Sequence, residues 1–90
     1  MYAKTTEILN ATGLHARPCA EFVAKAKTFA SNVTIRKTDA PNAVNAKSMV
    51  LVMTQGFNKG TLVELSAEGE DETQAVDTLV ALIESGFGEL

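Results

Sequence analysis

The only histidine of the chain, His15, lies among residues that could support phosphoryl chemistry. It belongs to the segment Gly-Leu-His-Ala-Arg-Pro (residues 13–18), where a loop meets the start of an expected helix. Amides at a helix start lack intrahelical partners and lie at the positive end of the helix dipole, so they stabilise an anion. A neutral imidazole can act as a nucleophile, and the planar donor fork of Arg17 suits phosphate oxygens. The segment could therefore form a reversible phosphohistidine site; a capping or ordinary surface histidine is the alternative.

The single cysteine, Cys19, limits the other chemistry that is open to the chain. One cysteine forms neither an internal disulfide nor a cysteine cluster for zinc. Because His15 and Cys19 are the only two soft ligands, we expect no metal and no cofactor. Their four-residue spacing leaves a cysteine–histidine nucleophile pair as an alternative. Cys19 also falls on the apolar stripe of the expected helix, which favours a packed core thiol.

Ser48 is a second candidate for modification. It precedes the apolar run Met-Val-Leu-Val-Met (residues 49–53), which suits a helix N-cap, and N-capping is compatible with phosphorylation. Five consecutive apolar residues on a short helix cannot all face inward, so we expect Met49 and Met53 to be exposed in a docking surface. A phosphate on Ser48 would add roughly two negative charges to that surface.

The elements that must position these residues alternate along the chain. Apolar spacing predicts an amphipathic helix at 16–29 and another from Ala75 to Ile83 that stops near Gly86. Residues 48–55 fit a short helix or a buried strand, and Ser48 with Gly56 favours the helix. We expect strands at residues 2–9, 33–37, 43–46 and 61–67. The order β-α-β-β-α-β-α predicts an α+β fold in two layers, with helices on one side of a sheet.

Length and composition restrict the class of protein. Ninety residues with 46% hydrophobic and 21% charged content predict one globular domain, residues 1–90. A net charge of -3 disfavours nucleic-acid binding. The absence of a long apolar run or of an apolar signal core predicts no membrane insertion, and we expect a cytoplasmic protein. Residues 1–47 carry seven basic and three acidic side chains, against one and eight in residues 48–90, so a positive face for an anionic ligand or an acidic partner is an alternative to chance.

Four segments together resemble the HPr family, the histidine-containing phosphocarriers of the bacterial phosphoenolpyruvate:sugar phosphotransferase system. They are residues 13–18, 45–48 (NAKS), 56–60 (GFNKG) and 66–72 (SAEGEDE). The resemblance covers nearly the whole chain. It implies a βαββαβα open-faced sandwich, with a four-stranded antiparallel sheet covered on one face by three helices.

The same resemblance implies a function. His15 would accept a phosphoryl group on Nδ1 from phosphorylated enzyme I, charged by phosphoenolpyruvate, and pass it to the enzyme IIA domain of a sugar transporter. Arg17 would hold the phosphate, assisted by the backbone amides of Ala16 and Arg17. The chain would be a covalently modified carrier rather than an enzyme that turns over alone, and we expect a monomer.

The resemblance also implies regulation at Ser48. An HPr kinase/phosphorylase would modify this serine, and the phosphoserine form would bind a transcription factor in carbon catabolite repression. The implied docking surface, shared by the carrier's partners, comprises Leu14, Met49, Val50 and Met53, with Phe22 beside them.

Some residues depart from the family pattern. The turn at residues 37–42 is longer than usual and lacks glycine, and Leu51 stands where glycine is frequent. A carrier of the paralogous nitrogen-related system can share the longer turn and an ending like Ser-Gly-Phe (residues 85–87), so it remains an alternative, although Lys47 and Ser48 favour the sugar system. A purely regulatory module that acts through phosphorylated Ser48 is another alternative.

Overall fold

The computed structural model describes all ninety residues and has the predicted α+β architecture. Four strands and three helices follow one another in the expected order, and a short 3₁₀ turn, η1, ends the chain. Their bounds are β1 Tyr2–Glu7, α1 Ala16–Ala26, β2 Asn32–Lys37, β3 Val44–Asn45, α2 Met49–Thr54, β4 Leu62–Glu68, α3 Glu72–Glu84 and η1 Gly86–Gly88.

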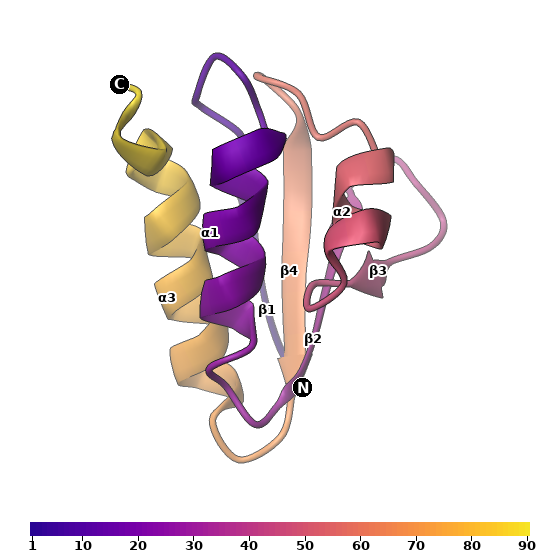
Figure 1. Cartoon of the computed structure of the whole chain (residues 1–90). Helices are drawn as coiled ribbons and strands as arrows, with labels where there is room; N and C mark the ends of the chain where they lie inside the picture. The colour runs from indigo at the N-terminus through magenta and orange to yellow at the C-terminus, as the bar shows by residue number, and fades with distance from the viewer.

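The sheet is antiparallel throughout, with the strand order β1-β4-β2-β3. β4 lies between β1 and β2, so that Glu64 is opposite Thr5 on one side and Arg36 on the other. Figure 1 shows α1 and α3 side by side over one face of the sheet, with α2 next to α1. The three helices leave the other face open, as the predicted open-faced sandwich requires. No helix has the length and apolar character needed to cross a membrane.

The core lies between the helices and the covered face of the sheet. Alternate residues of β4, namely Val63, Leu65 and Ala67, are buried, as the period-two pattern of a strand requires. The predicted apolar stripes of α1 and α3 meet these side chains. The buried helix residues are Pro18, Cys19, Phe22, Val23 and Ala26 in α1, and Ala75, Val76, Leu79, Val80 and Ile83 in α3.

Helix α1 ends three residues earlier than the predicted range 16–29. Its last turn tightens, because the amide of Thr28 bonds to the carbonyl of Lys25 and the Thr28 hydroxyl donates to the same oxygen at 2.6 Å. Thr28 therefore satisfies the end of the helix with its own side chain. Phe29 stays half-buried against the core without being helical.

The longer turn at residues 37–42 is held by Arg36 instead of by a glycine. The Nη1 atom of Arg36 donates to the carbonyls of Lys37, Thr38 and Ala40 at 3.0–3.2 Å. Its Nε atom donates to the Glu64 carboxylate at 3.1 Å. One guanidinium thus binds the turn to the centre of the sheet, on the open face and away from the helices.

Asp71 fastens the connection between α1 and β2 to the start of α3. Its carboxylate accepts hydrogen bonds from the amides of Ala30 and Ser31, both at 2.9 Å, and from the Ser31 hydroxyl. The Ser31 hydroxyl and the Ala30 amide lower the pKa of Asp71, because they stabilise the charged form. The folded protein therefore binds this proton less readily than the unfolded chain does.

This pKa shift predicts how stability depends on pH. The contribution of Asp71 is complete above its unfolded pKa of about 3.9 and is lost as the pH falls through the lower folded value. We expect Asp71→Asn to lower the urea midpoint relative to the unsubstituted protein at pH 7, and to lower it less at pH 3. The same substitution at the exposed turn residue Asp39 is the control. A deficit of equal size at both pH values would contradict the assignment.

Candidate functional site

His15 is at the N-cap of α1, where it is exposed and does not act as a cap. Its backbone is extended (φ -127°, ψ 155°), and its side chain makes no capping hydrogen bond. The capping alternative therefore does not hold. An exposed imidazole at the start of a helix is accessible to a reacting partner.

The loop before His15 is anchored by the loop that precedes β4. The amide of Leu14 donates to the carbonyl of Phe57 at 2.9 Å. Gly13 has a positive φ of 66°, and a Cβ added there would lie 2.4 Å from the same carbonyl oxygen. Only glycine allows this close approach. The backbone that carries His15 is thus fixed by a segment more than 40 residues away.

The prediction that Leu14 belongs to the docking surface is wrong. Its side chain is 0% exposed and forms part of the core, as does that of Phe22. Successive side chains of an extended segment point to opposite sides, so the anchoring that exposes His15 turns Leu14 inward. The resemblance to the HPr family indicated Leu14 but did not indicate that its side chain points into the core.

The second loop also contacts the imidazole directly. The Nε2 atom of His15 lies 3.3 Å from Oδ1 of Asn58. Because a side-chain carbonyl oxygen only accepts hydrogen bonds, this contact favours the neutral tautomer that has its proton on Nε2 and its lone pair on Nδ1. The resemblance at residues 56–60 did not predict a role for Asn58. Nothing local marks a residue 43 positions from its partner.

The start of α1 has an unusual backbone. Ala16 has a φ of +49°, in the left-handed region, which costs about 1 kcal/mol or more for a residue with a Cβ. Ala16 and Arg17 are the first helical residues, so their amides have no acceptor within the helix. Such amides are available to an anion that approaches the exposed ring of His15.

Arg17 forms an ion pair on the surface of α1 and does not contact His15 in this structure. Its Nη1 atom is 2.5 Å from Oε1 of Glu21, one helical turn further on. The side chains are 64% and 38% exposed. The guanidinium is therefore near the histidine in sequence but already holds a carboxylate.

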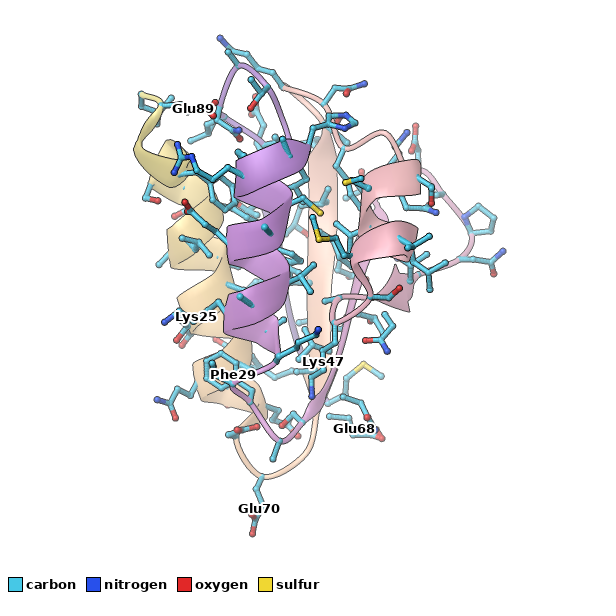
Figure 2. The ribbon with its side chains drawn as sticks, viewed as in Figure 1. Lys25, Phe29, Lys47, Glu68, Glu70 and Glu89 are labelled. Atoms are coloured by element: carbon cyan, nitrogen blue, oxygen red, sulfur yellow. The ribbon has the colours of Figure 1, made fainter.

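A second carboxylate, that of Glu89, lies close to the same region. It accepts hydrogen bonds from the Thr12 hydroxyl at 3.0 and 3.1 Å and from the Asn10 amide at 3.3 Å. Desolvation opposes ionisation, but these hydrogen bonds and the charge of Arg17 lower the pKa of Glu89 overall. Figure 2 shows Glu89 at the end of the molecule where the chain terminates. The C-terminal segment thus ties down the loop that leads to His15, which the sequence did not predict.

Cys19 is a core thiol, as its place in the apolar stripe predicted. It is buried, its Sγ atom lies 4.0 Å from the carbonyl of Met49, and burial raises its pKa. A protonated, inaccessible thiol is a poor nucleophile. The alternative of a cysteine–histidine pair is therefore not supported. No group of three or more His, Cys, Asp or Glu side chains is placed to bind a metal ion.

Ser48 caps α2, which confirms the helical alternative for this segment. Its Oγ atom accepts a hydrogen bond from the amide of Leu51 at 3.3 Å. The neighbouring Lys47 donates from Nζ to the carbonyl of Phe29 at 2.8 Å, and Figure 2 shows these two residues close together. The segment before the helix is therefore tied to the end of α1.

One side of α2 presents apolar side chains to solvent. The exposure expected for Met49 and Met53 is confirmed, since each is 39% exposed, and Val50 is 71% exposed. Val52 is buried and holds the helix to the core. We call Met49, Val50 and Met53 the α2 patch. Helix α2, which carries the patch, contacts α1, the helix that begins after His15.

The contact between His15 and Asn58 yields a prediction about the tautomer. Asn58→Ala removes the acceptor for Nε2–H, so the ratio of the Nε2–H to the Nδ1–H form should fall by about three- to tenfold. Nitrogen-15 chemical shifts of the labelled ring at a pH where it is neutral measure this ratio. Asn42→Ala, in the remote turn, is the control and should leave it unchanged. An unchanged ratio in Asn58→Ala would show that Asn58 does not select the tautomer.

Comparisons with known proteins agree on one family. A family model described as the phosphorylation site of the PTS HPr component matches residues 2–85. The phosphocarrier protein HPr of Haemophilus influenzae is 47% identical over 83 residues, which cover 92% of this chain and 95% of the relative. The crystal structure of HPr-C-His from Thermoanaerobacter tengcongensis has a TM-score of 0.93 at 50% identity, covering 100% of this chain and 99% of that one.

A third relative is named for a different role. The crystal structure of Crh, the catabolite repression containing protein of Bacillus subtilis, is described as a dimer with a swapped domain. It has a TM-score of 0.73 at 40% identity and covers 96% of this chain and 97% of that one. Sequence, fold and the matched phosphorylation-site segment all lead to the same assignment: the chain belongs to the HPr family of phosphocarrier proteins of the phosphotransferase system.

Proposed function

We propose that this chain accepts a phosphoryl group on Nδ1 of His15 from phosphorylated enzyme I and passes it to enzyme IIA domains of sugar transporters. The observation that carries the proposal is the exposed imidazole whose Nε2 atom faces Asn58 Oδ1. This contact leaves the nucleophilic lone pair on Nδ1, at the start of α1. Phosphoenolpyruvate is the source of the phosphoryl group in this proposal.

The transfer step forms a nitrogen–phosphorus bond on His15 as the bond to the donor breaks. The Nδ1 lone pair of His15 attacks phosphorus, while the electron pair of the bond between phosphorus and the donor atom of enzyme I returns to that atom. Water takes no part. The ring of His15 gains positive charge as the bond forms, and Asn58 Oδ1 stabilises it by accepting from Nε2–H. Transfer to enzyme IIA is the same step in the opposite direction.

The phosphate oxygens need positive partners once they reach His15. The amides of Ala16 and Arg17 supply the positive end of the helix dipole, and the exposed Arg17 guanidinium can turn to the phosphate. The site is open to solvent, so the partner protein must cover it and exclude water during transfer. The chain would bind the phosphate and the partner would exclude water, which suits a carrier that depends on the enzymes before and after it in the transfer.

Docking of these partners would use the α2 patch. Helix α2 contacts α1, so a partner that reaches His15 at the start of α1 could bury the α2 patch in the same interface. Methionine side chains adapt to differently shaped surfaces, which suits a carrier that must bind both enzyme I and enzyme IIA.

Regulation at Ser48 is the second component of the proposal. A phosphate there would lie at the start of α2, adjacent to the α2 patch, and would add roughly two negative charges to the docking surface. We propose an HPr kinase/phosphorylase as the modifying enzyme and a transcription factor of carbon catabolite repression as a partner of the phosphoserine form. An acidic partner surface would be repelled by the modified protein.

We propose a cytoplasmic monomer as the working form. β1 pairs with β4 of its own chain along the full strand, so the sheet is complete without a second copy. The swapped dimer described for Crh shows that a relative with this fold can assemble differently.

Two other functions remain to be distinguished from the sugar-system carrier. A carrier of the nitrogen-related system would use the same His15 chemistry with another enzyme I, and only partner specificity separates the two. A purely regulatory module would act through phosphorylated Ser48, and similarity to Crh, a catabolite repression protein, makes this function a candidate. The exposed His15 favours a carrier, because a regulatory module has no need of it.

Phosphoryl transfer from phosphoenolpyruvate tests the proposal. With sugar-system enzyme I, the protein should gain the mass of one acid-labile phosphoryl group, Ser48→Ala should behave alike, and His15→Ala should gain none. With the kinase and ATP, His15→Ala should gain an acid-stable phosphate that Ser48→Ala lacks. Failure with a competent sugar-system enzyme I would reject this assignment, and success with the nitrogen-system enzyme I would then favour the paralogous carrier.

The α2 patch predicts a specific loss of docking. Met53→Ala removes exposed apolar area from the α2 patch, so the KM for enzyme I should rise by about three- to tenfold with little change in kcat. Leu62→Ala is the matched control, because Leu62 is 50% exposed on β4, outside the α2 patch. Equal values of KM for both variants would show that α2 does not dock enzyme I.

A further inference from the structure

Glu21 holds the Arg17 guanidinium in an ion pair, and this guanidinium is the group that would bind the phosphate. The two residues are four apart on α1, and their 2.5 Å contact holds the guanidinium along the helix. Glu21 is the only acidic residue of α1. The charge nearest in sequence to His15 is therefore neutralised before any phosphoryl group arrives.

Phosphorylation of His15 gives Arg17 a second anionic partner that competes with Glu21. A phosphoryl group brings roughly two negative charges. Its oxygens attract the Arg17 fork more strongly than a single carboxylate does. If Arg17 turns to the phosphate, Glu21 loses its partner and remains as an uncompensated carboxylate close to the new dianion. Both changes raise the free energy of the phosphorylated state relative to the free protein.

We propose that Glu21 is a positioning residue that competes with the phosphoryl group for Arg17 and thereby keeps the phosphohistidine ready for transfer. The inference rests on the proposed function of His15. Its mechanism is an exchange of ion pairs: the Arg17–Glu21 pair opens as the His15 nitrogen–phosphorus bond forms, and it closes again when the group leaves. A carrier benefits from such competition, because a phosphate held too tightly would not be passed on.

The size of the effect follows from the exposure of the pair. Exposed i,i+4 ion pairs contribute modestly, so removal of the competitor should shift the phosphorylation equilibrium by about two- to fivefold. Salt screens both the ion pair and the repulsion between Glu21 and the phosphate, so the shift should shrink at high ionic strength.

The test is the equilibrium between phosphoenolpyruvate and the carrier, with enzyme I in catalytic amount. Mass spectrometry gives the phosphorylated fraction at fixed ratios of phosphoenolpyruvate to pyruvate. We expect Glu21→Gln to raise the equilibrium constant for phosphorylation by about two- to fivefold over the unsubstituted protein. Glu70→Gln makes the same change of net charge at the opposite end of the molecule from Glu89 (Figure 2) and should have no effect.

A double-mutant cycle separates competition from general repulsion. In an Arg17→Ala background there is no guanidinium to compete for, so the effect of Glu21→Gln should fall to less than half of its size. An unchanged equilibrium constant in Glu21→Gln, or an equal shift with and without Arg17, would overturn the inference while leaving the carrier function intact. Absence of phosphorylation in the unsubstituted protein would overturn both.

Discussion

The site depends on the close packing of the loop before α1 against the loop before β4. The hydrogen bond from the Leu14 amide to the Phe57 carbonyl is its centre, and Gly13 lets the two backbones approach. This contact turns Leu14 into the core and His15 out to solvent. It also places Asn58 beside the imidazole, so the same packing exposes the ring of His15 and gives its Nε2 atom a hydrogen-bond partner. The start of α1 alone, without the loop before β4, would neither expose the ring of His15 in this way nor bring Asn58 next to it.

Around this anchor the electrostatics are balanced rather than simply positive. The start of α1 offers amides to an anion, while Glu21 and Glu89 supply negative charge near Arg17. A site made only of cations would trap a phosphate. In the proposed function the phosphoryl group must be passed on as well as accepted, and nearby carboxylates oppose its binding by a modest free energy. The open position of His15 is consistent with chemistry that partner proteins complete.

The architecture could be predicted from the sequence because its signals are local. The apolar stripes of α1 and α3, the alternation in β4 and the capping serine of α2 each act within a few residues of themselves. The end of α1 was predicted too late, since the Thr28 side chain closes the helix before the apolar pattern stops.

The candidate site was predictable only in part. The segment 13–18 identified His15 and Arg17, and the apolar run identified the exposure of Met49 and Met53. The direction of Leu14 and the contact of Asn58 depend on a tertiary approach between distant loops, which no local pattern encodes. The four-residue spacing of Arg17 and Glu21 permits an ion pair on a helix, but the sequence analysis did not predict this pair.

The most direct test of the account is the identity of the atom that carries the phosphoryl group. The protein, labelled with nitrogen-15 in its histidine ring, is phosphorylated through enzyme I and examined by nitrogen and phosphorus NMR. We expect phosphorus–nitrogen coupling to Nδ1 of His15, with the proton of the free ring on Nε2. Coupling to Nε2 would contradict the role given to Asn58, and phosphate on any other residue would contradict the site itself.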